Sequence, residues 1–201
     1  MTEKLSNPKK TIEVIQKHGF DFQKKFGQNF LIDPHVLDKI IGSAEITKDD
    51  VVLEIGPGIG PLTAQLARRG EKVVSVELDR TLLPILAETL SDYDNVEIVP
   101  GDILKTDIAA LCRERMPGLP VVACANLPYN ITTPVITALL QAQCFQAVTV
   151  MIQREVALRI CAAPGSSDYG AFSVFCQYHT QPELLFEVGP ECFLPAPKVT
   201  S

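Results

Sequence analysis

The alternation of short apolar runs with longer amphipathic stretches constrains the fold of this chain more than any other feature. Five β-branched runs follow one another from about residue 50, at 51–55, 73–77, 96–100, 121–125 and 147–152. Helical patterns fall between them, at 61–70, 79–90, 103–115 and 132–143. Strands that are continuously apolar are buried on both faces, and strand–helix alternation places them in parallel. We therefore expect an α/β fold with a mostly parallel sheet and helices on both faces.

The pattern changes after residue 170. The segments FSVFCQYH (172–179) and ELLFEV (183–188) are predicted to be strands, and only a few residues separate them. A connection this short requires antiparallel pairing, because a parallel crossover needs a dozen or more residues. We expect a C-terminal antiparallel hairpin. A Rossmann-like parallel sheet that ends in such a hairpin is typical of class I methyltransferases.

Composition and charge exclude several classes of protein. No apolar run in the 201 residues approaches the roughly 18 needed to cross a bilayer, and the N-terminus lacks the apolar core of a signal peptide. The six cysteines show no C-x-x-C spacing, which indicates cytosolic thiols and no metal site. We expect a cytoplasmic protein that does not bind membranes.

The formal charge of −6 is unevenly distributed. Residues 1–30 hold six lysines and three acidic residues, whereas the remainder is strongly acidic. A basic N-terminal segment is typical either of contacts with nucleic acid or of an ordinary solvated helix. The pI of about 5.1 argues against a general nucleic-acid coat protein.

A Gly-rich turn follows the first of the predicted strands. In VLEIGPGIGPLT (52–63), three glycines at positions 56, 58 and 60 lie between a strand and a helix. Glycine there lets the backbone approach a ligand closely. The dinucleotide fingerprint would need a third glycine at position 61, which is Pro61. The turn therefore indicates a ligand other than a dinucleotide.

Acidic residues end the next two strands. Glu77 lies 21 residues after Gly56, where a carboxylate can accept from both ribose hydroxyls. Asp102 can accept from an adenine amino group, cap the following helix, or do both. Glu54 points into the same region or caps a helix. With no P-loop lysine in the sequence, this pattern predicts a cofactor that carries adenosine without phosphates, namely S-adenosylmethionine.

The fourth strand ends in Asn126-Leu127-Pro128-Tyr129. The Asn126 side-chain oxygen and the Leu127 carbonyl can accept both N–H bonds of an adenine amino group, which directs its lone pair at a methyl donor. Pro128 fixes the turn, and Tyr129 offers a face for a flipped base. We predict these four residues to be catalytic, with Asn126 also beside the cofactor. The alternative is an ordinary turn at the end of a strand.

Six segments, in order, resemble the ribosomal RNA adenine dimethyltransferases: KKFGQNFLID (24–33), LEIGPGIGPLT (53–63), GDIL (101–104), ANLPYNITTPVI (125–136), QREVALRI (153–160) and CFLPAPKV (192–199). The resemblance runs from about residue 10 to residue 201. It implies that Gln28, Asn29 and Leu31 line the methionine end of the cofactor and that Gly56 and Gly58 approach it. It also assigns Glu77 to the ribose, Asp102 to the adenine, and Tyr129 and Phe193 to the target base. Without it, Phe193 is equally an ordinary packed side chain.

The resemblance is strongest to the branch that dimethylates N6 of two adjacent adenines near the 3′ end of small-subunit rRNA. It implies rRNA in an assembling ribosomal subunit as the partner, and we expect a monomer. Two alternatives remain: a large-subunit rRNA methylase that confers antibiotic resistance, and a non-catalytic nucleic-acid-binding protein on the same fold. Basic residues that could reach RNA phosphates are Lys24, Lys25, Arg154 and Arg159.

The expected organisation has two parts. Residues 1–45 form a basic segment and helix that pack over the cofactor site, and residues 46–201 form the cofactor-binding catalytic domain. Members of the family carry a small helical C-terminal domain after the Pro-x-Pro-Lys-Val segment, and we expect that domain to be absent from these 201 residues.

Overall fold

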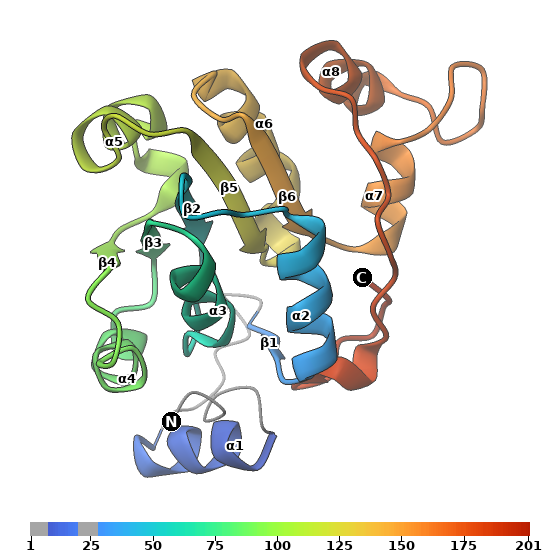
Figure 1. Cartoon of the computed structure of the whole chain (residues 1–201). Coiled ribbons are helices and arrows are strands. Elements are labelled where there is room, and N and C mark those ends of the chain that lie inside the picture. Colours follow the sequence, from blue (N-terminus) through green and yellow to red (C-terminus); the bar gives the residue numbers. More distant parts are fainter. Residues whose placement is uncertain (1–7, 20–27) are drawn as a thin grey trace.

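The computed structural model describes residues 8–19 and 28–201, and its centre is a five-stranded sheet (Figure 1). The strands lie in the order β4-β3-β2-β5-β6 and every neighbouring pair is parallel, which confirms the expected parallel sheet. Their bounds are β2 Val51–Ile55, β3 Lys72–Glu77, β4 Val96–Pro100, β5 Val121–Asn126 and β6 Ala147–Met151.

Eight α-helices are found among the described residues: α1 Pro8–Lys17, α2 Pro34–Ser43, α3 Pro61–Arg69, α4 Leu83–Thr89, α5 Ile108–Arg115, α6 Thr132–Ala142, α7 Arg154–Ile160 and α8 Ala171–His179. Two of the predicted helices are divided. A 3₁₀ turn, η2 Arg80–Leu82, precedes α4, and η3 Ile103–Lys105 precedes α5. Pro84 lies in the first turn of α4, where the missing proline N–H costs no hydrogen bond. Further 3₁₀ turns are η4 Tyr129–Ile131 and η5 Pro190–Cys192.

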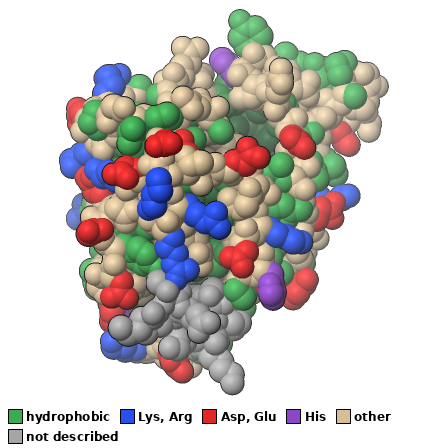
Figure 2. Space-filling view, viewed as in Figure 1, with side chains coloured by type: hydrophobic (Ala, Val, Ile, Leu, Met, Phe, Trp, Pro, Cys, Tyr) green, Lys and Arg blue, Asp and Glu red, His purple; other side chains and the backbone are tan. Residues whose placement is uncertain are grey.

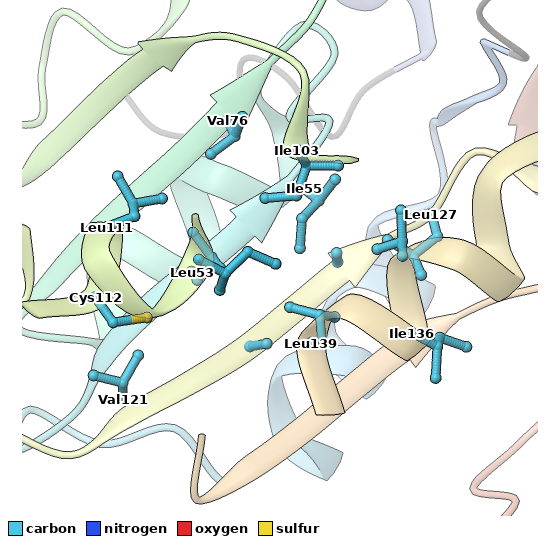
Figure 3. Close-up of a cluster of buried hydrophobic side chains, with 14 of the residues drawn as sticks. Leu53, Ile55, Val76, Ile103, Leu111, Cys112, Val121, Leu127, Ile136 and Leu139 are labelled. Carbon is cyan, nitrogen blue, oxygen red and sulfur yellow. The ribbon is translucent and has the colours of Figure 1, made fainter. Parts of the chain in front are cut away.

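Helices cover both faces of the sheet, as expected. Alternate residues of a strand point to opposite faces. On one face, Leu53 packs in a cluster with Leu111 of α5 and Leu139 of α6 (Figure 3). On the other face, Val52 packs with Leu37 of α2 and Leu66 of α3 in a second cluster. Burial of apolar side chains on both faces provides the main stabilisation of the sheet.

A second, two-stranded sheet joins segments from opposite ends of the chain. β1 (Phe30–Leu31) pairs antiparallel with β7 (Phe193–Leu194), with Phe30 opposite Leu194 and Leu31 opposite Phe193. Leu31 and Phe193 belong to the cluster under α2, whereas Phe30 packs with Ile59 of the Gly-rich turn. The small sheet therefore fixes residues 28–31 beside the carboxyl ends of the main strands.

The predicted hairpin of 172–179 and 183–188 is wrong. The first segment forms α8, and the second is in no strand. Phe172 and Phe175 lie one helical turn apart and pack beside buried Cys176 in the cluster on the α5–α6 face. The Oγ of buried Ser173 donates to the Arg159 carbonyl (2.5 Å) and accepts from the Gly170 amide (3.1 Å). Tertiary packing thus overrides the strand propensity of aromatic and β-branched residues.

The segment 183–188 runs beside β6 across a groove. Residues from β6, α6, α7, α8 and this segment line the groove, and Figure 2 shows hydrophobic side chains in the recess. Only Val188 makes paired backbone bonds, and its partner is Ser201. The segment therefore lies alongside the sheet without joining it.

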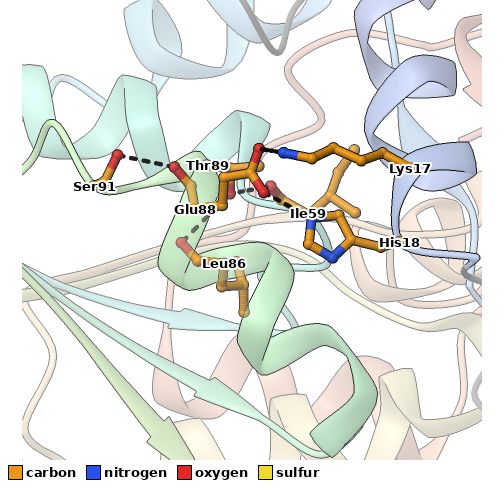
Figure 4. A network of polar contacts seen from close by, with 7 residues as sticks. All are labelled: Lys17, His18, Ile59, Leu86, Glu88, Thr89 and Ser91. Atoms are coloured by element: carbon orange, nitrogen blue, oxygen red, sulfur yellow. Dashed lines mark hydrogen bonds and ion pairs between the residues drawn. The ribbon is translucent and has the colours of Figure 1, made fainter.

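The N-terminal helix α1 packs against α4. Lys17 Nζ and His18 Nε2 contact the two carboxylate oxygens of Glu88, at 2.5 and 2.8 Å (Figure 4). These hydrogen bonds lower the pKa of the Glu88 carboxyl. Beneath them, buried Ile15 packs in a third cluster with Ile59 and Leu86. Because such exposed ion pairs contribute little, the apolar contact of Ile15 is the firmer attachment.

A buried carboxyl connects the sheet to α3. The Oε2 atom of Glu54 accepts from Thr63 Oγ1 of α3 (2.6 Å) and from Ser75 Oγ of β3 (2.7 Å). Burial raises the pKa of Glu54 to about 7, and the two hydroxyl bonds act in the opposite direction. Glu54 thus holds the start of the helix after the Gly-rich turn onto two strands.

Among the described helices, none combines the length and the apolar composition needed to cross a membrane.

Ser173→Ala tests the helical assignment of α8. The substitution leaves the Gly170 amide and the Arg159 carbonyl without their shared partner, so we expect a loss of about 1–3 kcal/mol in the free energy of unfolding. Equilibrium urea unfolding measures it. Ser166→Ala, at an exposed turn with a hydroxyl bond to Ala163, is the matched control. Equal stability of the two variants would contradict the assignment.

Glu54→Gln tests the buried carboxyl through pH. A carboxyl whose pKa is raised on folding keeps its proton longer in the folded chain. Folding stability therefore falls as the pH rises from 4.5 to about 7, by about 3 kcal/mol. The variant lacks this dependence, so its unfolding free energy relative to wild type should rise by that amount across the window. Parallel pH curves for the two proteins would refute the assignment.

A control of opposite sign is Glu97→Gln. Lys72 and Arg115 both bond the Glu97 carboxylate, which lowers its pKa. A lowered pKa stabilises the fold above the pKa of the unfolded chain and loses that contribution as the pH falls. The Glu97 variant should therefore have a lower free energy of unfolding than wild type near neutral pH, and the difference should shrink as the pH falls.

Candidate functional site

A pocket lies at the carboxyl ends of the parallel strands, where ligands bind in open α/β sheets. The structure brings eleven of the twelve predicted site residues to its wall: Gln28, Asn29, Leu31, Gly56, Gly58, Glu77, Asp102, Asn126, Leu127, Pro128 and Tyr129. They come from the ends of β2, β3, β4 and β5 and from the segment that leads into β1. Residues spread over a hundred positions of sequence therefore share one cavity.

The Gly-rich turn has a backbone that side chains would obstruct. Gly56, Gly58 and Gly60 all have positive φ values, +67°, +62° and +93°, which glycine adopts without a steric penalty. A Cβ at Gly58 would lie 3.0 Å from the Phe30 ring, and one at Gly56 would lie 3.9 Å from the Pro128 ring. The turn thus packs glycine backbone against Phe30 and Pro128 at the strand ends, where Gly56 and Gly58 line the pocket.

Glu77 ends β3 at the wall of the pocket, and its side chain is buried. Its Oε1 accepts from the Asp79 amide (2.7 Å) and its Oε2 from the Gly58 amide (3.3 Å). Burial raises the pKa of the carboxyl to about 7, against the lowering effect of these amides. A carboxylate has about four lone-pair sites, so each oxygen can accept a further bond from a ligand hydroxyl.

Gln28 lies beside the turn that follows β3. Its Nε2 donates to Asp79 Oδ2 (2.8 Å), while Asp79 Oδ1 accepts from the Thr81 amide and hydroxyl. Asp79 thus caps η2 and joins the N-terminal segment to the end of β3. The amide of Gln28 therefore supports the turn that carries Glu77 as well as lining the pocket.

Asp102 both faces the pocket and caps a turn. Its Oδ1 accepts from the Leu104 amide (3.0 Å) at the start of η3. Lys105 Nζ lies 3.7 Å from Oδ2. The cap acts on the short 3₁₀ turn, and α5 begins only at Ile108. Oδ2 is therefore the freer oxygen for a ligand.

The side chain of Asn126 is oriented by the N-terminal segment. Its Nδ2 donates to the Asn29 carbonyl (3.3 Å), and within the described chain its Oδ1 accepts no bond. The Leu127 amide donates to the Met151 carbonyl of β6 (3.1 Å), and the Pro128 carbonyl accepts from the Ile131 amide and the Thr132 hydroxyl. The turn after β5 is thereby fixed with the Asn126 oxygen free to accept.

Tyr129 begins η4 directly after this turn and is partly exposed at the pocket. Its hydroxyl lies 2.5 Å from Ser201 Oγ. Burial raises the pKa of the phenol, and the bond with Ser201 acts in the opposite direction. The ring is therefore neutral near pH 7 and carries an apolar face.

Phe193 does not reach the pocket, contrary to prediction. Its side chain is 3% exposed and packs beneath α2 with Leu31 and Val36. Pairing of β1 with β7 turns it into this cluster. In this position its ring has no free face for a base, which corresponds to the alternative of an ordinary packed side chain.

Sequence reasoning missed several pocket residues. Phe30, Leu82 and Ile103 form apolar wall, and Asn130 adds an amide. The aromatic residue inside the QNFLI run was a signal for Phe30.

Of the four basic residues that could reach RNA phosphates, the described chain includes two, both on α7. Lys24 and Lys25 lie outside the described residues, Arg154 bonds Glu187 (2.5 Å), and Arg159 is exposed. On the face seen in Figure 2, basic and acidic side chains are interspersed.

Comparison with known proteins agrees with this geometry. The sequence model for "Ribosomal RNA adenine dimethylase" matches residues 19–201. The "Ribosomal RNA small subunit methyltransferase A" of Lachnoclostridium phytofermentans is 55% identical over 98% of this chain and 69% of its own length. That of Clostridioides difficile is 47% identical over 99% of this chain and 69% of its own length.

Solved structures are similar as well. A dimethyladenosine transferase from Plasmodium falciparum superposes with a TM-score of 0.73 at 32% identity, over 84% of this chain and 59% of that one. The 23S rRNA methyltransferase ErmE superposes with a TM-score of 0.69 at 33% identity, over 86% of this chain and 66% of that one. The chain belongs to the ribosomal RNA adenine dimethylase family.

Proposed function

We propose that this chain transfers methyl groups from S-adenosylmethionine to N6 of adenine in small-subunit rRNA. The observation that carries the proposal is the oriented amide of Asn126, whose oxygen accepts no bond within the described chain and which lines a pocket together with Glu77 and Asp102. An acceptor fixed beside a cofactor pocket suits a reaction in which an amino group must be polarised without a strong base.

The charge of the pocket fits the proposed cofactor. Its described lining includes three carboxyls, Glu54, Glu77 and Asp102, and neither lysine nor arginine. Such a lining disfavours phosphate groups and favours a cation. S-adenosylmethionine, when bound, supplies a methyl group on a positively charged sulfur.

The residues present can hold each part of such a molecule. Glu77 keeps accepting capacity for the ribose hydroxyls, and Asp102 Oδ2 for the adenine amino group. Gly56 and Gly58 line the pocket beside Pro128, where we assign their backbone to the cofactor. Gln28, Asn29 and Leu31 line the remaining wall, which we assign to the methionine end.

The turn after β5 then prepares the target adenine. The Asn126 Oδ1 atom and the Leu127 carbonyl accept the two amino protons, which makes the nitrogen lone pair available for attack. Tyr129 supplies an aromatic face for the flipped base. As the new N–C bond forms, the bond between the methyl carbon and the positively charged sulfur would break and leave a neutral thioether. The extra proton on nitrogen then leaves to water, so the site needs no strong general base.

The names of the relatives support the small subunit as substrate. Those from L. phytofermentans and C. difficile are named small-subunit methyltransferases, whereas ErmE, named a 23S rRNA methyltransferase, is 33% identical.

Within this function we further propose that the two adjacent adenines near the 3′ end are the targets, in an assembling subunit. We also propose that the protein acts in the cytoplasm as a monomer, with residues 46–201 as its catalytic domain. The intact Asn126–Tyr129 turn favours catalysis over a binding role alone.

Glu77→Ala tests the cofactor site. Loss of the carboxyl leaves the ribose hydroxyls unpaired, so we expect binding of S-adenosylmethionine to weaken by about 1–3 kcal/mol. Isothermal titration calorimetry measures it. Glu97→Ala, which removes a carboxyl from the adjacent strand outside the pocket lining, is the matched control and should bind normally. Wild-type affinity of the Glu77 variant would exclude the assigned role.

Asn126→Ala tests the chemistry. We expect single-turnover methyl transfer to unmodified small subunits to slow by about 100-fold or more, because one acceptor for the developing charge is lost. Cofactor affinity should stay within about threefold, since Glu77 and Asp102 remain. Asn126→Asp keeps an acceptor oxygen and should be faster than the alanine variant. Undiminished transfer by Asn126→Ala would show that the amide does not polarise the amine.

A further inference from the structure

A hydroxyl from the C-terminal segment reaches the catalytic turn. Ser201 is 8% exposed, and its Oγ lies 2.5 Å from the hydroxyl of Tyr129. The two residues are 72 positions apart and belong to different parts of the fold. Neither the sequence pattern nor the family resemblance singled out Ser201.

The backbone around Ser201 is anchored at two places. Its amide and carbonyl exchange hydrogen bonds with those of Val188, at 2.9 and 2.6 Å. The preceding carbonyl, of Thr200, accepts from the Arg154 amide at the start of α7 (2.9 Å). Val188 is itself buried in the cluster beneath α2. The serine hydroxyl is therefore presented from a fixed position.

Tyr129 is less constrained on its own side. It opens a three-residue 3₁₀ turn, its side chain is only partly buried, and it lines the pocket. Rotation about its side-chain bonds would change the orientation of the ring at the pocket wall. A hydrogen bond at the far end of the ring restricts that rotation to orientations that keep the two oxygens together.

The bond with Ser201 does not make Tyr129 a base. Burial raises the pKa of the phenol, so Tyr129 keeps its proton near pH 7, and either of the two hydroxyls can donate in the bond between them. The value of the contact is therefore geometric.

We propose that Ser201 is a positioning residue that holds the Tyr129 ring in the orientation that receives the target adenine. The inference rests on the proposed function, because it assumes that Tyr129 stacks on that base. It adds a residue from a second segment to the recognition of adenine and makes the 188–201 backbone pairing part of the site.

The test is a double-mutant cycle with Ser201→Ala and Tyr129→Phe in the full chain. Each substitution removes one hydroxyl group of the pair and leaves the aromatic ring at position 129 in place. We expect each to raise KM for unmodified small subunits, or to lower kcat, by about three- to tenfold, with affinity for S-adenosylmethionine unchanged. The double variant should be no worse than either single one, because both remove the same bond. Ser201→Thr should restore activity toward wild type.

Two comparisons decide the outcome. Ser91→Ala, which removes an exposed hydroxyl bonded only to the Glu88 carbonyl on α4, is the matched control and should behave as wild type. Multiplicative effects of Ser201→Ala and Tyr129→Phe, or normal kinetics for Ser201→Ala, would overturn the proposal.

Failure of the proposed function would look different. In that case wild-type protein would not methylate unmodified small subunits at all. The cycle would then be measured on urea unfolding, where non-additivity of the two substitutions supports the contact and additivity refutes it.

Discussion

The position of β2 is the constraint on which the rest of the structure depends. Both of its edges are paired, with β3 on one side and β5 on the other, and all three strands run the same way. The chain proceeds outward from β2 through β3 to β4, then returns across the sheet to β5 and β6. The loops after β2 and β5 therefore diverge to opposite faces and leave a crevice between them. Gly56 and Pro128 meet across that crevice, so the Gly-rich turn and the Asn126–Tyr129 turn are neighbours because of the strand order.

The crevice contains two buried carboxyls whose charged forms are disfavoured by burial. Burial raises the pKa of both Glu54 and Glu77 to about 7, and their mutual repulsion contributes for Glu54. Such perturbed groups cluster where a protein binds or reacts. Glu54 is tied down by two hydroxyls from α3 and β3, whereas Glu77 keeps capacity for a ligand. The two acids lie on adjacent strands and both line the pocket, but the hydroxyl bonds of Glu54 join α3 to the sheet.

Much of this was predictable from the sequence. The strands β2 to β6 fall within a residue or two of the predicted runs, since buried parallel strands must be continuously apolar. Strand ends also located Glu77, Asp102 and Asn126. The segment 172–179 could not be assigned in this way, because its aromatic and β-branched residues favour a strand by propensity, whereas the spacing of three between Phe172, Phe175 and Tyr178 fits a helix. Packing on α6 and α7 decides for the helix. The prediction that Phe193 contacts the target base was wrong for a related reason. The direction of a side chain in a strand depends on the partner strand, and the partner here, β1, is distant in sequence.

The small sheet of β1 and β7 has a consequence for the motions of the molecule. Phe30 and Leu194 are 164 residues apart in sequence, and the ladder between their strands is only two residue pairs long, with one further backbone bond from the Ile32 amide to the Cys192 carbonyl. Contacts of such high sequence separation form late in folding, since they close the largest loop. A ladder this short also opens at a free energy far below that of global unfolding. Its opening would release the carbonyl of Asn29 from Asn126 while the parallel sheet stays intact. Amide hydrogens of this sheet should accordingly exchange with solvent sooner than those of β2.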